Sequence, residues 1–392
     1  MLGRAFLALC LIYFLNSFLV APFSSLFPVY VEADLERQPW FTGYLRAVML
    51  ALGGIFAVIG GRLCDLLGRK VTLLIGLAGS MLTGLVFNVS DPFALSLLVI
   101  GLGVATGPFS TAGQSYLITS VHSRRLGLGA ALYFLSNTAG NALGSLVTGL
   151  LKEQAWPYSR IGTAMTTSLV AAFALALILL PGERRPRREA GPRRAPTFWT
   201  SYRILLARRE VHLLISLRFL ITSFWGMATL LLPLVLFRVS GSQSVPAYFA
   251  AVSLAFAAAC QLLTGLLCDR FGRFWPLLLS AAGIAVSGLG LALFWQSVPG
   301  LFVLGTALTG TAWAVSTLLP KLINDVAAPE EKNLLVGLGH LVWSAAMVTG
   351  SLVGGVLVEA HPAAPFFTGA ALASAGTFCA WRLCVRLDRN GS

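Results

Sequence analysis

The chain has 392 residues, of which 57% are hydrophobic and only 11% are charged. Soluble domains carry about 25% charged residues, so this composition excludes an ordinary soluble protein. The formal net charge of +13 does not indicate nucleic-acid binding, because the basic residues gather in short segments between long apolar runs. Those runs have about 20 residues or more, the length of one bilayer crossing.

The apolar runs predict twelve membrane-spanning helices in an all-α integral membrane protein. The first run is too long for a secretory signal peptide and lacks a small-residue cleavage site, so we expect it to be the first span. The first six spans cover residues 5–31, 41–62, 71–89, 92–119, 126–151 and 161–181. The second six cover residues 210–237, 246–267, 275–295, 299–322, 333–358 and 363–385.

The basic residues fall mainly on one side of the predicted membrane. An even number of spans puts Arg4 on the same side as the C-terminal arginines and as nine arginines between Glu183 and Glu210. Cytoplasmic loops of membrane proteins carry the excess of lysine and arginine. We therefore expect a multi-pass protein of the inner or plasma membrane with both termini in the cytoplasm. Acids at the span ends, such as Asp325, are expected to be solvated loop charges.

The six cysteines fall within the predicted spans or at their cytoplasmic ends, where reducing conditions disfavour disulfides. No pair of them has the spacing of a zinc site. We expect them to pack as small apolar residues, and we expect no metal and no other cofactor. They are Cys10, Cys64, Cys260, Cys268, Cys379 and Cys384.

A proline- and arginine-rich segment from Pro181 to Trp199 lacks apolar periodicity and divides the chain. We predict an N-terminal half over residues 1–181, a cytoplasmic linker over 182–209 and a C-terminal half over 210–392. The halves are similar in sequence, which predicts a tandem repeat of one six-helix unit. A shift of 204 positions superposes Gly61, Leu63, Cys64, Asp65, Gly68 and Arg69 on Gly265, Leu267, Cys268, Asp269, Gly272 and Arg273, and a shift of 210 superposes Gly140 and Gly144 on Gly350 and Gly354.

The doubled phrase G-x-L-C-D-x-x-G-R, which starts at Gly61 and at Gly265, resembles the signature loop of the major facilitator superfamily, G-x-L-a-D-r-x-G-r-k. The resemblance implies two six-helix bundles related by pseudo-two-fold symmetry, and secondary transport by alternating access. It also implies that the loops act as a latch between the halves at the cytoplasmic face. The expected latch residues are Gly61, Asp65, Gly68 and Arg69, and Gly265, Asp269, Gly272 and Arg273.

The chemistry of this loop suits a structural contact. We expect Asp65 to accept hydrogen bonds from exposed N–H groups at the start of a neighbouring helix, where a negative charge is favoured. Arg69 and Lys70 are expected to pair with acids or carbonyl groups. The alternative is that these charges only anchor the loop at the membrane surface.

The resemblance further implies a substrate cavity near the middle of the membrane, lined mainly by spans one, four, seven and ten. Polar or aromatic residues at mid-span are the candidates for lining it. These are Tyr13, Asn16, Ser17, Gln114, Tyr116, Arg218, Thr222, Trp225, Trp313 and Ser316, with Asn137, Asn141, His340 and Trp343 as a second group.

Two arginines interrupt apolar runs, and each needs a partner, a cavity or a route to the surface. Arg46 lies about one turn from the external end of its span, so it either snorkels or serves an anion or gating role. Arg218 lies about two turns from the cytoplasmic end, so it either binds substrate or forms an ion pair. No aspartate or glutamate lies at mid-span, which argues against a carboxylate proton relay and against organic cations.

Span five carries glycines at Gly140, Gly144 and Gly149, which resemble a degenerate antiporter motif of the family. Ser145 stands where that motif has a proline, and span four lacks the arginine of many proton-coupled relatives. Close helix packing in lipid explains the same glycines. Both interpretations stay open from the sequence.

These features predict a monomeric secondary transporter that moves a small molecule through the lipid bilayer, driven by a proton or solute gradient, and they favour an exporter. The chain carries no phosphate loop for ATP and no recurring set of nucleophile, base and orienting residue, so we expect no enzyme. One alternative is uptake or exchange of an anionic metabolite through Arg46 or Arg218. Another is a membrane receptor or scaffold without transport.

Overall fold

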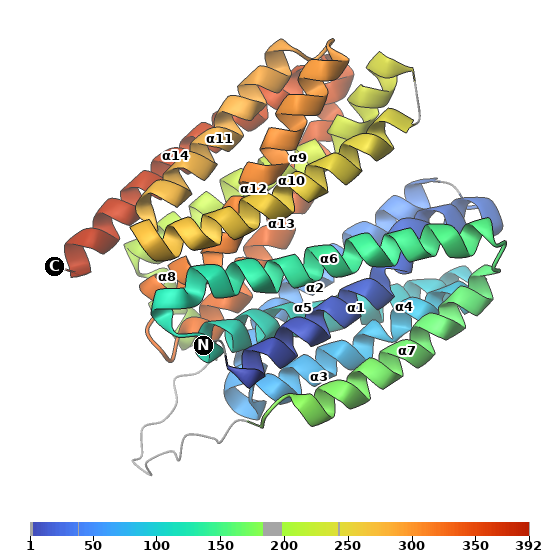
Figure 1. Cartoon of the computed structure of the whole chain (residues 1–392), viewed down its shortest axis with the longest axis horizontal. Helices are drawn as coiled ribbons and strands as arrows, with labels where there is room; N and C mark the ends of the chain where they lie inside the picture. Colours follow the sequence, from blue (N-terminus) through green and yellow to red (C-terminus); the bar gives the residue numbers. More distant parts are fainter. Residues whose placement is uncertain (1–2, 38, 183–197, 242–243, 392) are drawn as a thin grey trace. The chain divides into compact units, whose positions relative to one another are not determined.

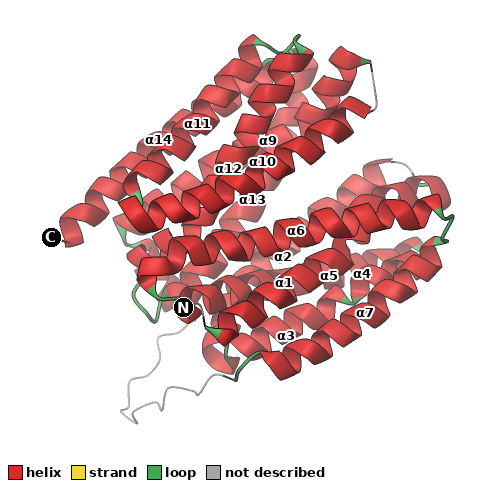
Figure 2. Cartoon of the chain, viewed as in Figure 1, coloured by secondary structure: helices red, strands yellow, loops and turns green. Residues whose placement is uncertain are grey.

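A computed structural model describes residues 3–37, 39–182, 198–241 and 244–391. Within these residues every regular element is a helix, as Figure 2 shows. Long apolar runs can satisfy their backbone hydrogen bonds inside a bilayer only in a helix or a closed barrel. The prediction of an all-α protein is confirmed.

The helices of the N-terminal half follow the six predicted spans, with one interruption (Figure 1). The third span ends its first helix at Ser80 and continues after Met81 as a short α-helix and a 3-10 turn. The elements are α1 (Arg4–Val29) with a π-helical turn (Tyr30–Asp34), α2 (Pro39–Leu67), α3 (Arg69–Ser80), α4 (Leu82–Leu85) with the turn Val86–Asn88, α5 (Pro92–Ser120), α6 (Leu126–Glu153) after the turn Ser123–Arg125, and α7 (Tyr158–Leu179).

The C-terminal half follows its six predicted spans as well. One helix, α8, lies inside the segment that the sequence predicts as a linker, 182–209, and it was not predicted. Residues 183–197 of that segment lie outside the described residues. The elements are α8 (Phe198–Leu206), α9 (Arg209–Ser240), α10 (Ser244–Phe271), α11 (Phe274–Leu293), α12 (Val298–Val326), α13 (Lys332–Ala360) and α14 (Ala364–Gly391).

The two copies of the repeated loop make the same tight connection. Gly68 joins α2 to α3 with φ +89°, and Gly272 joins α10 to α11 with φ +78°. This left-handed conformation is open to glycine and disfavoured for residues with a Cβ atom. The glycine in each D-x-x-G-R phrase is therefore required by the turn.

Ten helical segments among the described residues are long and apolar enough to cross a bilayer. The other two predicted spans, α6 and α14, have 28 residues each. They are less apolar, since α6 carries Asn137 and Asn141 and α14 ends in the charged stretch Arg382–Arg389. With these two, the helices agree with the twelve predicted spans.

By their contacts, the residues divide into two compact units. Unit one contains Met1–Val121, Leu132–Ser201 and Glu330–Leu341, and unit two contains His122–Ala131, Tyr202–Pro329 and Val342–Ser392. Each unit thus holds most of one predicted half and a short stretch of the other, from the start of α6 or of α13. The boundaries 1–181 and 210–392 follow the sequence repeat and stay a prediction.

Small residues allow the helices to pack closely inside each unit, as is common in lipid. In unit one α2 packs along α5, and a Cβ atom added at Gly60 would lie 2.8 Å from the Cα atom of Pro108. In unit two α14 packs along α9 and α11, and a Cβ atom added at Gly288 would lie 2.7 Å from the ring of Phe224.

The glycines that the two halves share in spans five and eleven confirm the close-packing interpretation. Gly140 and Gly144 of α6 lie against the backbone of α1 at Phe14 and Phe18. Gly350 of α13 lies against the backbone of α9 at Ser223. In each half the same helix pair therefore meets through glycine. The alternative role in gating stays a prediction.

Candidate functional site

The first copy of the repeated loop contacts the start of α13 within unit one. Asp65 Oδ1 accepts a hydrogen bond of 2.6 Å from Asn333 Nδ2, and Arg69 Nε donates one of 3.4 Å to Asn333 Oδ1. Gly61 leaves room for this contact, because a Cβ atom there would lie 2.6 Å from the carbonyl oxygen of Asn333. The neighbouring Lys70 donates to the carbonyl oxygen of Leu177 at 2.8 Å. The side chain of Asn333, which the sequence patterns did not indicate, thus connects Asp65 with Arg69.

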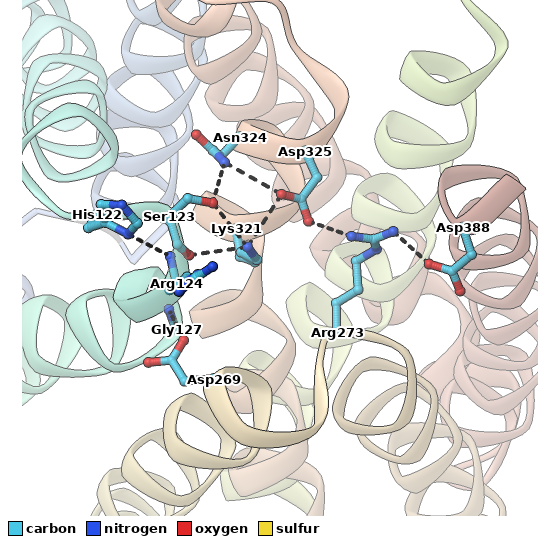
Figure 3. Close-up of polar contacts among 10 residues, drawn as sticks. All are labelled: His122, Ser123, Arg124, Gly127, Asp269, Arg273, Lys321, Asn324, Asp325 and Asp388. Carbon is cyan, nitrogen blue, oxygen red and sulfur yellow. Dashed lines mark hydrogen bonds and ion pairs between the residues drawn. The ribbon is translucent and has the colours of Figure 1, made fainter. Parts of the chain in front are cut away.

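The second copy contacts the start of α6 within unit two, as the lower left of Figure 3 shows. Asp269 Oδ1 accepts from the backbone N–H of Gly127 and Asp269 Oδ2 from that of Leu128, both at 2.9 Å. The first N–H groups of a helix have no partner inside the helix and carry partial positive charge, so a carboxylate stabilises them. Gly127 and Gly265 are both needed, since a Cβ atom at either would lie 2.7 Å from the other's carbonyl oxygen.

The contact that was predicted for Asp65 is made by Asp269. Asp65 was predicted to accept from backbone N–H groups at a helix start, but its hydrogen bond comes from the side chain of Asn333. Asp269 makes the predicted kind of contact instead. The physical reason is the partner at each helix start: a side-chain amide meets Asp65, whereas Gly127 leaves the backbone open to Asp269.

Arg273 forms the centre of a charged cluster in unit two (Figure 3). Its two terminal nitrogens bind Asp325 at 2.9 Å and Asp388 at 2.7 Å. Lys321 lies 3.5 Å from the other oxygen of Asp325, and it also donates to the carbonyl oxygen of Ser123 at 3.2 Å. The prediction that Asp325 is a solvated loop charge is wrong, because its side chain is only 13% exposed and contacts two cations.

The clusters of the two copies are unequal. Arg69 donates to a neutral amide, whereas Arg273 binds two carboxylates. Asp325 and Asp388 belong to α12 and α14, so the arginine of the second copy connects two further helices of unit two.

Two tyrosines predicted to line a cavity are engaged in packing inside unit one. The hydroxyl of Tyr13 donates to the carbonyl oxygen of Phe109 at 2.9 Å, and its ring lies 4.6 Å from that of Phe109 and 4.4 Å from that of Tyr133. Tyr116 is buried, and its hydroxyl donates to the carbonyl oxygen of Pro181 at 3.2 Å. Since Pro181 follows the end of α7, Tyr116 lies near that end of the helices and not at mid-span.

A polar ladder joins α1 and α6 in unit one. Asn137 Nδ2 donates to Ser17 Oγ at 2.7 Å, and Asn141 Nδ2 donates to the backbone oxygen of Asn137 at 3.2 Å. Asn16, which precedes Ser17 in the sequence, is also buried, and no partner reaches its Oδ1 among the described residues. Gln114 of α5 is also buried. The two asparagines of the second group thus contact each other, and Asn137 contacts Ser17, a candidate of the first group.

The candidates of the second half lie on α9 and α12 of unit two. Arg218, Thr222 and Trp225 are spaced four and three residues apart on α9 and so share one face of that helix. Trp313 and Ser316 are three apart on α12. Within the described residues, no hydrogen-bond partner reaches Arg218 Nε or Trp313 Nε1, although both atoms are buried. An ion pair of Arg218, one of the predicted alternatives, is not among the contacts of the described residues.

The remaining candidate residues lie on α2 and α13. Arg46 is exposed on α2, which favours the interpretation that it snorkels to the membrane surface. His340 and Trp343 of α13 are partly buried. All six cysteines are free thiols, in line with the expected packing role.

Comparison with known proteins gives consistent matches along the chain. A family model described as Major Facilitator Superfamily matches residues 9–293 and 241–391. The chain is similar to the enterobactin exporter EntS of Escherichia coli O1:K1 / APEC, with 28% identity over 364 residues, which cover 90% of this chain and 83% of that protein.

Solved structures share the fold. The human organic anion transporter MFSD10 (TETRAN) matches with a TM-score of 0.80 and 16% identity, covering 96% of this chain and 99% of that chain. The fucose:proton symporter FucP of E. coli matches with a TM-score of 0.74 and 15% identity, covering 96% of this chain and 98% of that chain. At such identities these two matches bear on the fold alone.

Proposed function

Because the chain belongs to the Major Facilitator Superfamily, and is therefore a multi-pass membrane transporter of a small molecule, we propose that it works as an exporter. The observation that carries this direction is the similarity to enterobactin exporters, which extends over 90% of the chain and so includes both halves of the repeat. The fold does not set the direction, since a fucose:proton symporter has it too. The proposed location is the inner or plasma membrane, with both termini in the cytoplasm.

In this proposal the two repeated loops are the latches of alternating access. Each latch fastens the end of one helix to the start of another from the opposite half: Asp65 to α13, and Asp269 to α6. Hydrogen bonds to ionised groups contribute about 1.5–3 kcal/mol each, which suffices to bias two conformations and is small enough to be overcome during transport. The latch residues thereby control the populations of the two states and do not contact the substrate.

The proposed driving force is a proton or solute gradient. The predicted spans carry no acid at their middle. A proton-coupled cycle would therefore use groups at the ends of the helices or outside the spans.

The test is transport in membrane vesicles of both orientations. Everted vesicles expose the cytoplasmic face, so an exporter accumulates its substrate there when a gradient is imposed and releases it when the gradient collapses. Enterobactin, the substrate named for the relatives, is the first compound to use. Accumulation only in right-side-out vesicles would support the uptake alternative. Binding without flux in either orientation would support a receptor or scaffold.

A further inference from the structure

Unit two holds a group of buried polar atoms without hydrogen-bond partners among the described residues. Five of them lie away from the helix ends: Arg218 Nε and Ser223 Oγ on α9, both amide atoms of Gln261 on α10, and Trp313 Nε1 on α12. Arg273 Nε and Thr306 Oγ1 are also without partners, but they lie nearer to the helix ends. Gln261 is 0% exposed. A buried polar group without a partner costs about 1–3 kcal/mol, and native proteins seldom leave several together. Such a group indicates a place where another molecule supplies the partners.

Ser223, Gln261 and Trp313 lie at nearly one depth and Arg218 about one turn away, because contacts between the helices fix their register. Helices α9 and α12 are antiparallel: Arg208 Nη2 donates to the carbonyl oxygen of Val326 at 2.7 Å, and Leu232 lies against Gly305. Interpolation between these two contacts puts Trp313 level with about residues 221–224 of α9, at 1.5 Å per residue.

Helix α10 runs parallel to α12, and its register is fixed in the same way. A Cβ atom at Gly310 would lie 2.6 Å from the ring of Phe256 and 2.8 Å from the sulfur of Cys260. Gln261 is therefore level with Trp313 to within about one turn. Arg218 lies about 6 Å further along α9. The unpartnered atoms thus form one polar layer across three helices.

The charge of Arg218 has no compensating acid in this layer. Helices α9, α10 and α12 carry their acids only at their ends, as Glu210, Asp269 and Asp325. Glu210 lies about 12 Å along the helix from Arg218 and binds Arg386 at 2.6 Å. Asp269 and Asp325 are engaged in the contacts described above. An arginine in a bilayer span is costly without an anion or water beside it.

We infer that Arg218, Gln261 and Trp313 form the anion-recognising part of the transport site, and that the substrate is an organic anion with an aromatic ring. The guanidinium group suits a carboxylate or sulfonate, which it binds with two parallel hydrogen bonds. The indole of Trp313 and the amide of Gln261 supply further donors. Trp225, on the same face of α9 as Arg218, and Trp313 offer rings for stacking. This inference rests on the proposed function, because it names the substrate class of the same transporter.

The experiment measures binding of three probes that share one ring system and differ in charge: 2-naphthoate, 2-naphthamide and 2-naphthylmethylammonium. The full-length protein is reconstituted in lipid nanodiscs, and binding is measured by calorimetry. We expect 2-naphthoate to bind at least tenfold more tightly than either other probe. Arg218→Gln should remove this preference, and Arg218→Lys should keep part of it, because lysine keeps the charge and loses the paired hydrogen bonds.

Two matched variants define the controls. Arg238→Gln removes an exposed arginine from the other end of α9 and should leave the binding of all three probes unchanged. Trp313→Phe keeps a ring and loses the N–H donor, so it should weaken all binding without abolishing the preference for the anion. If Arg218→Gln fails to fold, Arg218→Lys and Trp313→Phe still test the inference, since the first keeps the positive charge and the second keeps an aromatic ring.

Equal binding of 2-naphthoate and 2-naphthamide to the wild type, or no binding of 2-naphthoate at all, would overturn the inference. An undiminished preference for the anion in Arg218→Gln or Arg218→Lys would do the same. The vesicle assay separates this failure from that of the proposed function. Export of a substrate without any charge preference would support the proposed function and contradict the inference about the anion site. Anion binding that depends on Arg218, without flux, would support the anion site and contradict the proposed function.

Discussion

At the scale of single residues, the two latch aspartates differ in the partners that would remain after neutralisation. Asparagine at position 65 can still exchange hydrogen bonds with Asn333, because each amide has a donor and an acceptor. Asparagine at position 269 would face two backbone N–H groups with one oxygen and one NH2 group. The same substitution therefore has unequal consequences in the two copies.

We predict that Asp269→Asn lowers the export rate about tenfold, which corresponds to about 1.4 kcal/mol, and that Asp65→Asn lowers it less than threefold. The larger loss follows from the backbone N–H that would face the new NH2 group without an acceptor, and from the missing charge at the start of α6. Initial rates in everted vesicles, normalised to the amount of protein, provide the measurement. The prediction is wrong if Asp65→Asn is the more damaging change.

At the scale of the helices, the repeated glycines of the latch are needed for close approach. We predict that Gly265→Ala abolishes most of the transport, because its Cβ atom would lie 2.7 Å from both the Cβ atom of Ala131 and the carbonyl oxygen of Gly127. Gly339→Ala is the matched control, since nothing lies within 4 Å of a Cβ atom there. Alanine in a helix is about 0.5–1 kcal/mol more favourable than glycine, so this control should unfold at the same or a higher temperature. Similar transport by the two variants would count against the close contact.

The sequence predicts the helices well because hydropathy and the doubled phrase depend on local pattern alone. It misses the break at Met81 and helix α8, which depend on packing and on a short amphipathic stretch. It also misses the partners of the latches. The negative charge of Asp65 indicates a contact with a helix start. The identity of that start, and the presence of Asn333 there or of Gly127 beside Asp269, depend on tertiary structure.

At the scale of the whole molecule, the family assignment confirms the resemblance of the doubled loop. The repeat in the sequence leaves the chemistry of each half free to differ. The first half places a neutral polar ladder between α1 and α6, and the second half places Arg218 in its polar layer. This division could not be predicted from the repeat, because the superposed positions are the glycines and latch residues and not the candidates for binding.

In the proposed transport cycle, the contact between Asp65 and Asn333 breaks once in each turnover. We predict that the double variant Asp65→Cys, Asn333→Cys, in a background without the six native cysteines, stops transport when oxidised and recovers it when reduced. The hydrogen bond of 2.6 Å brings the two side chains close enough for a disulfide to form with modest backbone movement. Asp65→Cys alone should respond to neither treatment. Full export with the disulfide formed would mean that this contact persists throughout the cycle and that Asp65 has only a structural role.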